Sequence, residues 1–187
     1  MENDEVLDII KRIRSGETDA FRVLVRQYKN MVYGLALKMC HSVEDAEDVT
    51  QDTFIKAYKS IAQFKGKSKF STWLYQIGYF TAINQLRKQK YAVAEHDEAV
   101  ADEPDEGVLN KLKTDDQRNL ISRSLAYLKP DERAVITLFY LEEHSNDEIA
   151  EITKMSLSNV KVKIHRARKK LYGIMNDLMK NELTSLI

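Results

Sequence analysis

Apolar residues three and four positions apart, with few helix-breaking residues between them, constrain this fold most strongly. The 187 residues include only six Gly and two Pro, and no alternating apolar and polar run is long enough to build a sheet. We therefore predict an all-α protein. The clearest apolar stripe lies within residues 21–39 and consists of Phe21, Leu24, Val25, Tyr28, Val32, Leu35, Ala36 and Met39.

Capping signals predict where several helices begin and end. A helix over residues 6–14 is expected to end at Ser15 and Gly16, and Ser42 is placed to cap the third helix. Further helices are predicted from about Ser71 and over residues 114–128. Pro130 is expected at the first turn of the next helix, where its missing N–H costs nothing.

Charge divides the neutral chain into two basic blocks and an acidic segment between them. Residues 1–90 carry a net charge of +4, residues 91–117 carry −7 and residues 118–187 carry +3. The acidic segment is expected to be extended by self-repulsion, either as an inert tether or as a strand lying in a basic channel of a larger partner. We predict two small helical domains, residues 1–90 and 114–187, joined by an acidic linker at residues 91–113.

The cysteine content and hydropathy of the chain predict a cytoplasmic protein. Cys40 is the only cysteine, so no disulfide framework is available and a reducing compartment is expected. No apolar run approaches the ~20 residues that span a bilayer, so no stable membrane insertion is expected. The acidic start of the chain also argues against a signal peptide.

Aromatic and basic residues alternate within residues 64–90, which hold six of the sixteen aromatic residues and the only Trp. Aromatic faces can stack on unpaired bases for ~1 to 3 kcal/mol per base while cations follow the phosphates. The same pattern fits an amphipathic helix with aromatic residues in the core, and the stretch alone does not decide. The aromatic residues are Phe64, Phe70, Trp73, Tyr75, Tyr79 and Phe80; the cations are Lys65, Lys67, Lys69, Arg87, Lys88 and Lys90.

The helix predicted after Ser42 has an outward face that is acidic and partly apolar. A metal site would need further ligands, which no His or second carboxylate helix supplies, so no metal is expected. The alternatives are a solvated surface or a docking face for a basic partner helix. The face consists of Asp45, Asp48, Gln51, Asp52 and Ile55.

Residues 145–171 have the layout of a helix-turn-helix. Ser145 and Glu148 form a capping-box pattern, and a break at residues 154–156 separates two helices. The second helix is polar and basic on its outer face, which suits entry into a major groove. Asn159 and Lys161 lie near its start and are predicted to contact bases, because Asn pairs with adenine and Lys with guanine.

Together these segments resemble the extracytoplasmic-function sigma factors, the compact two-domain branch of the bacterial sigma-70 family. The resemblance covers nearly the whole chain. In the first domain it is carried by DAEDVTQDTF at residues 45–54, AYKSIAQFKGKSKFSTWLYQI at 57–77 and LRKQK at 86–90. In the second it is carried by LKPDERAVITLFYLE at residues 128–142, EIAEI at 148–152 and NVKVKIHRARKKL at 159–171.

The resemblance implies a non-enzymatic transcription initiation factor without a cofactor. Its partners would be core RNA polymerase, promoter DNA as duplex and melted strand, and an anti-sigma factor. The acidic face would bind the clamp helices of the largest polymerase subunit. Contacts to the minus-ten element would come from Phe64, Lys65, Lys67, Ser68, Lys69, Phe70, Trp73, Tyr75, Arg87 and Lys88. Contacts to the minus-thirty-five element would come from Ser158, Asn159, Lys161, Val162, Lys163, His165, Arg166 and Arg168.

Three departures from the family pattern and two rival functions remain. Lys154 stands where the family often has Gly, Phe80 where it often has Asn, and Ser68 and Lys69 replace a commonly smaller or acidic pair. One alternative function for the chain is a free-standing helix-turn-helix regulator, which explains the second domain but gives the acidic face no role. The weaker alternative is a metal-dependent nuclease built on the acidic face.

Overall fold

The computed structural model describes residues 1–95 and 116–185, and their side chains over residues 1–89 and 120–180. Within these ranges the chain is helical and contains no strand, which confirms the all-α prediction. The first domain comprises α1 (Asn3–Arg14), η1 (Thr18–Ala20), α2 (Phe21–Cys40), α3 (Val43–Ser60), η2 (Ile61–Gln63) and α4 (Phe70–Glu95). The second comprises α5 (Asp116–Ala126), α6 (Pro130–Ile136), the π-helical turn η4 (Thr137–Leu141), α7 (Asn146–Thr153) and α8 (Leu157–Ser185).

Helices α4 and α5 lie on either side of the predicted linker. Helix α4 continues to Glu95, past the predicted domain end at residue 90. Helix α5 begins at Asp116, and the predicted domain start at residue 114 lies outside the described residues, as does most of the predicted linker at residues 91–113. In the part of the chain that the structure describes, no helix combines the length and the apolar character needed to cross a membrane.

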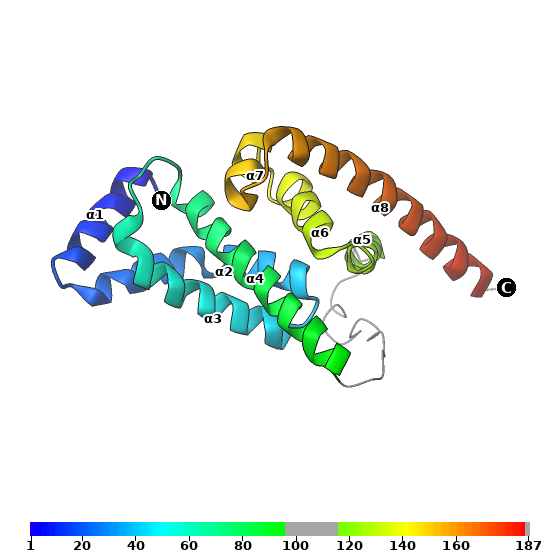
Figure 1. The fold of residues 1–187 in the computed structure, drawn as a ribbon, viewed down its shortest axis with the longest axis horizontal. Helices are drawn as coiled ribbons and strands as arrows, with labels where there is room; N and C mark the ends of the chain where they lie inside the picture. Colours follow the sequence, from blue (N-terminus) through cyan, green and yellow to red (C-terminus); the bar gives the residue numbers. More distant parts are fainter. Residues whose placement is uncertain (96–115, 186–187) are drawn as a thin grey trace.

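In the first domain, α2, α3 and α4 pack side by side and α1 lies across their end (Figure 1). Most residues of the apolar stripe predicted for α2 are buried, as the prediction requires. Residues of α1, α2, α3 and α4 meet in a shared core and keep the helices in contact. The core includes Val6, Ile10, Leu24, Val32, Phe54, Phe70 and Leu74.

Local capping chemistry determines several helix starts, as the sequence predicts. The Ser42 hydroxyl accepts a hydrogen bond from the Asp45 backbone N–H at 3.2 Å, and Pro130 is the first residue of α6. The Ser145 hydroxyl accepts from the Glu148 N–H at 3.2 Å, while the Glu148 carboxylate accepts from the Ser145 N–H at 2.9 Å. Each bond satisfies a backbone donor that a helix start leaves unpaired.

The turn between α7 and α8 uses a left-handed residue, as the comparison of Lys154 with the family's Gly suggests. Lys154 has φ 59° and ends α7. A side chain in this conformation costs ~1 kcal/mol relative to the right-handed one, and Gly would avoid that cost. The left-handed Lys154 therefore allows the helix-turn-helix geometry but lowers the free energy of unfolding.

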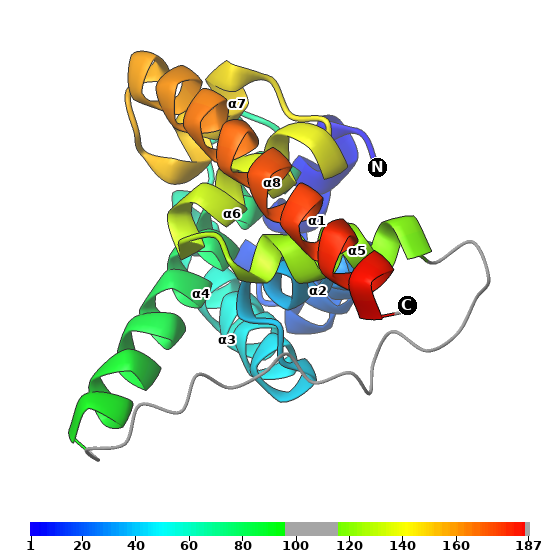
Figure 2. The ribbon, with the colours of Figure 1, turned by 90° about the vertical axis from the view of Figure 1, so that its right-hand side faces the viewer.

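The two domains pack against each other through one continuous apolar core. Side chains of α2, α3 and α4 form it on the first domain, and those of α6, η4, α7 and α8 form it on the second. The backbones of these elements lie against one another in Figures 1 and 2. Helix α8 packs on α5 and α6 and points away from the first domain (Figure 1). The core between the domains includes Leu35, Met39, Val49, Tyr75, Tyr79, Val135, Leu138, Ile149 and Ile152.

Arg133 connects the domains through its buried guanidinium. Its nitrogens donate to the carbonyl oxygens of Leu125 at 2.8 Å, Ala126 at 2.8 Å and Leu128 at 3.1 Å, at the end of α5. Nη1 also donates to the carbonyl oxygen of Met39, near the end of α2. Burial lowers the pKa of Arg133 to about 10, so the group remains charged at neutral pH and satisfies carbonyls at two helix ends.

Candidate nucleic-acid and protein interfaces

The predicted acidic docking face lies on α3, with one correction. Asp48, Gln51, Asp52 and Ile55 are all exposed and follow the three and four spacing of a single helix face. Asp45 instead turns toward α4, where its Oδ1 accepts hydrogen bonds from Gln85 Nε2 at 3.1 Å and Gln89 Nε2 at 2.7 Å. Asp45 therefore joins α3 to α4, and the exposed face consists of the other four residues.

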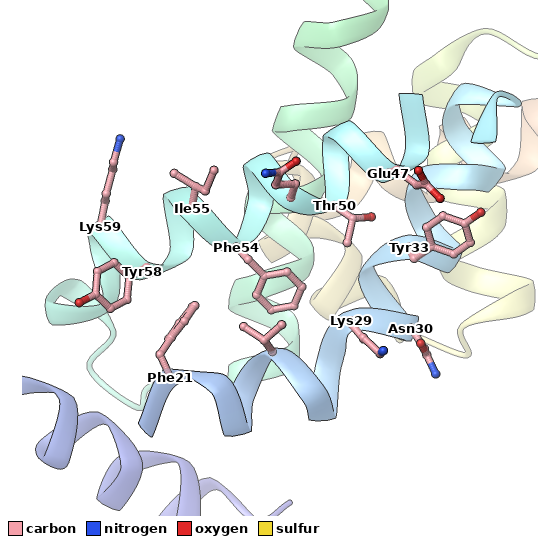
Figure 3. A pocket seen from close by; sticks show the side chains of 12 residues that line it. Phe21, Lys29, Asn30, Tyr33, Glu47, Thr50, Phe54, Ile55, Tyr58 and Lys59 are labelled. Carbon is pink, nitrogen blue, oxygen red and sulfur yellow. The ribbon is translucent and has the colours of Figure 1, made fainter. Parts of the chain in front are cut away.

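An apolar groove of about 650 Å³ runs beside this face, between α2 and α3 (Figure 3). Gln51 and Ile55 belong to both the face and the groove. The Phe21 and Tyr58 rings meet edge to face at a centroid distance of 5.1 Å within it, and Tyr58 remains 39% exposed. The sequence predictions include neither the groove nor the exposure of Tyr58. Its proximity to Ile55, one helical turn away, is the signal that would have indicated it.

Three aromatic residues predicted to contact DNA are buried. The exposed fractions are 4% for Phe64, 2% for Phe70 and 3% for Tyr75. The Phe64, Phe70 and Trp73 rings pack together with centroid distances of 5.3 to 5.4 Å, because core burial of these large rings is favourable. The expectation that Phe64, Phe70 and Tyr75 supply stacking faces is wrong for this arrangement, and the inward-facing alternative applies to them. Trp73 is half-buried.

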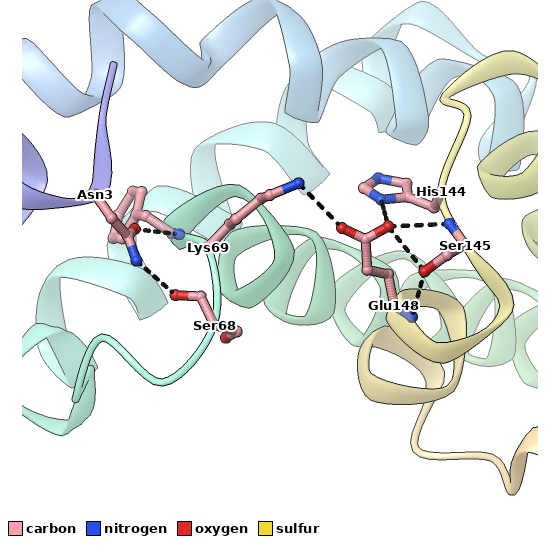
Figure 4. Close-up of polar contacts among 7 residues, drawn as sticks. Asn3, Ser68, Lys69, His144, Ser145 and Glu148 are labelled. Atoms are coloured by element: carbon pink, nitrogen blue, oxygen red, sulfur yellow. Dashed lines mark hydrogen bonds and ion pairs between the residues drawn. The ribbon is translucent and has the colours of Figure 1, made fainter.

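The loop before α4 presents its cations on a fixed backbone. Lys65 and Lys67 are exposed on either side of Gly66, which has φ 70°. Asn3 holds the end of the loop, because its Nδ2 donates to the Ser68 carbonyl at 3.2 Å and its Oδ1 accepts from the Phe70 N–H at 3.3 Å (Figure 4). No local pattern predicts this contact, because the residues are more than sixty positions apart.

The outer surface of α4 carries a polar pocket of about 280 Å³ around one exposed ring. Phe80 is 38% exposed there, beside Gln76 and Asn84. Lys56 of α3 closes one side and is held by its 3.1 Å hydrogen bond to Thr81 Oγ1. An exposed ring next to two amides suits an unpaired base, because the ring can stack and the amides can bond its edge. Arg87 and Lys88 are exposed further along α4.

The predicted recognition helix begins at Leu157 and exposes most of the predicted contacts to the minus-thirty-five element. Lys163 is the exception, because its side chain is only 20% exposed and its ammonium pairs with the Asp131 carboxylate of α6. Lys170 is tied to Glu132 of α6 in the same way, at 2.9 Å. Lys163 therefore anchors α8 to α6 in this arrangement. The exposed residues are Ser158, Asn159, Lys161, Val162, His165, Arg166 and Arg168.

Among the described residues no metal site is formed, and the Cys40 thiol and the His41 imidazole are held in their uncharged forms. Over residues 1–95 and 116–185, no three His, Cys, Asp or Glu side chains gather closely enough to hold a metal ion. Burial, reinforced by Asp45, raises the pKa of the Cys40 thiol to about 12, which keeps it protonated. Burial lowers the pKa of neighbouring His41 to about 4, which keeps the imidazole neutral.

Two family models match the two domains in order. Residues 24–91 match the model described as Sigma-70 region 2, and residues 118–171 match Sigma-70, region 4. The chain is 36% identical to the ECF RNA polymerase sigma factor SigW of Bacillus subtilis, over 90% of this chain and 96% of SigW. It is 34% identical to the ECF RNA polymerase sigma-E factor of Haemophilus influenzae, over 91% of this chain and 95% of that factor.

Solved structures give the same result for the fold. The sigma factor RpoE of Bartonella quintana, solved with the anti-sigma factor NepR, matches with a TM-score of 0.66 and 25% identity, over 83% of this chain and 96% of RpoE. CnrH, solved with the cytosolic domain of CnrY, matches with a TM-score of 0.66 and 23% identity, over 94% of this chain and 99% of CnrH.

Proposed function

The chain belongs to the extracytoplasmic-function sigma factors of the sigma-70 family, and from this premise we propose how its surfaces divide the work of initiation. As a transcription initiation factor it binds core RNA polymerase and directs it to promoters. The polymerase, and not this protein, catalyses RNA synthesis. Bacterial polymerase acts in the cytoplasm, and we propose that this protein acts there too. The first domain engages polymerase and the minus-ten element, and the second reads the minus-thirty-five element.

Polymerase docks on the exposed face of α3 and the groove beside it. The observation that supports this most is the meeting of carboxylates and exposed apolar side chains, where Asp48 and Asp52 lie next to Ile55. Apolar side chains of a partner helix would fill the groove, while basic side chains would pair with the carboxylates. Such a combination gives both apolar burial and electrostatic selection of the partner.

The minus-ten element contacts the outer surface of α4 and the loop before it. Extruding a base from the duplex costs a few kcal/mol, which stacking and phosphate contacts must offset. We assign the stacking role to Phe80, in place of the buried rings of Phe64, Phe70 and Tyr75. Lys65, Lys67, Arg87 and Lys88 follow the phosphates.

Replacing Phe80 by Ala is expected to slow promoter opening by ~5-fold to ~150-fold, because one stacked base contributes ~1 to 3 kcal/mol. Binding to core polymerase should change less than about twofold, since Phe80 lies on α4, away from the groove between α2 and α3. The measurement is the fluorescence of 2-aminopurine placed in the minus-ten element. Phe80→Trp is the matched control, because it keeps an aromatic face, and it should retain opening. Equal losses in both variants would contradict the stacking role.

An anti-sigma factor is proposed as the regulatory partner. The RpoE relative was solved bound to one, and the two chains match over most of their lengths. We place its binding on the same α3 face and groove, because a protein that covers them would exclude polymerase.

A further inference from the structure

Glu142 forms a polar contact between the two domains. It follows η4 in the second domain, and its carboxylate meets two groups of the first. Oε1 accepts from Lys38 Nζ of α2 at 2.7 Å, and Oε2 accepts from the Tyr75 hydroxyl of α4 at 2.6 Å. The Glu142 side chain is only 20% exposed, so these bonds are partly shielded from solvent. Burial, followed by the bond to Glu142, raises the pKa of Tyr75 and keeps its hydroxyl a donor.

Two further contacts join residues 144–148 of the second domain to the first domain. The His144 ring meets the Tyr75 ring edge to face at a centroid distance of 4.8 Å. Glu148, in the first turn of the helix-turn-helix, lies 3.4 Å from Lys69 Nζ in the loop before α4 (Figure 4). Here a carboxylate of the second domain neutralises a cation that the family resemblance assigns to minus-ten DNA.

The interface between the domains is incompletely filled at a place that Glu142 does not line. A pocket of about 350 Å³ remains between Tyr79, Ile83 and Arg87 of α4 and Pro130, Asp131 and Met155 of the second domain. Interfaces between domains of one chain commonly resemble transient protein interfaces, and relative motion of the domains is the default expectation. Polar contacts at such an interface therefore bear on whether it stays closed.

A protein that reads both promoter elements at once has to separate its domains. The two elements lie about 25 base pairs apart, which at 3.4 Å per base step is ~85 Å along the duplex. In the structure the two domains are in direct contact, and Lys38 Nζ of the first lies 2.7 Å from Glu142 Oε1 of the second. The described arrangement is thus a closed state that is incompatible with simultaneous contact to both elements.

We propose that Glu142, with Lys38 and Tyr75, forms a latch that adds to the apolar core between the domains in holding the free protein closed, and that has to break before both promoter elements are engaged. The functional consequence rests on the proposed division of promoter elements between the domains. The closed state itself does not depend on that function. Only the open form can bind both promoter elements, so the apparent dissociation constant equals the intrinsic constant divided by the open fraction, and the latch raises it by lowering that fraction.

The test is the charge reversal Glu142→Lys, which removes both bonds and places a cation beside Lys38. Glu143→Lys is the matched control, because Glu143 is the exposed neighbour in the same turn and the change in charge is identical. Small-angle scattering of the free protein should show a larger radius of gyration for Glu142→Lys and no change for Glu143→Lys. Adding Lys38→Glu to Glu142→Lys should restore part of the compaction, which a folding defect would not allow.

The second readout is assembly of the protein with core polymerase and a promoter fragment carrying both elements. Glu142→Lys should lower the apparent dissociation constant by ~10-fold to ~100-fold, since charge-assisted hydrogen bonds are among the stronger ones. An unchanged radius of gyration would overturn the latch whatever the protein's function. A larger radius with unchanged assembly would overturn its role in promoter binding. Wild-type protein that fails to assemble would overturn the proposed function instead.

Discussion

Replacing Asp48 and Asp52 together by Arg is expected to weaken binding to core RNA polymerase by at least ~100-fold. Both side chains are exposed on the docking face of α3, and the substitutions would oppose cations to the basic partner helix that we propose. Like-charge juxtaposition at an interface costs several kcal/mol, and 2.7 kcal/mol already corresponds to ~100-fold. Titration of labelled protein with core polymerase measures the loss.

The fold should tolerate this double substitution. Asp52 lies 4.0 Å from Lys56 in a largely exposed pair, which contributes at most ~1 kcal/mol. Asp4→Arg with Asp8→Arg is the matched control, because these exposed residues of α1 give the same change in net charge away from α3. Retained binding by the α3 variant, or an equal loss in the α1 variant, would remove polymerase docking from this face.

Replacing Lys161 by Ala is expected to reduce discrimination for the minus-thirty-five element by ~5-fold to ~150-fold. Lys161 is exposed near the start of α8, the end of a recognition helix that enters the major groove. A well-placed contact to a base edge is worth ~1 to 3 kcal/mol of selectivity. The measurement compares binding to the preferred upstream element with binding to variants changed one base pair at a time.

The matched control for Lys161 is Lys169→Ala. Lys169 is also exposed on α8 but lies two turns further along, where phosphate contact is expected. It should weaken binding to all sequences alike and lower the salt dependence, while leaving selectivity intact. A uniform loss in the Lys161 variant as well would make Lys161 a phosphate contact and leave Asn159 as the remaining predicted base contact.

The sequence predicts the helices well where their determinants are local. Ser42, Pro130 and Ser145 begin helices because capping and proline effects act within one turn, and all three are found where expected. The left-handed turn at Lys154 follows from comparison with a Gly that the family prefers. The apolar period within α2 predicts its buried face because that pattern is also set by residues close together in the sequence.

The sequence predicts the sites less well where two faces of a helix are both buried. Helix α4 packs against α2 and α3 on one side and against α7 on another, so Tyr75 is buried in the core between the domains. The contacts that redirect Asp45 and Lys163 join residues more than thirty positions apart. Periodicity carries no information about such partners, because it reports only which residues share a face.

The arrangement of the two domains could not be predicted from local patterns at all. The bond between Lys38 and Glu142 spans 104 positions, and that between Tyr75 and Glu142 spans 67. Before folding, Glu142 and Glu143 are equivalent neighbours in the sequence. Only packing of the second domain on α4 distinguishes the buried partner of Lys38 from its exposed neighbour.

Run-off transcription with core RNA polymerase from a related bacterium, on pooled genomic promoter fragments, tests the central claim most directly. We predict discrete transcripts that appear only when the protein is added, and whose start sites share one upstream pair of sequence elements. The contradictory result is an absence of new transcripts and of co-elution with core polymerase, together with sequence-selective binding to duplex DNA by the protein alone. That outcome would identify a free-standing helix-turn-helix regulator.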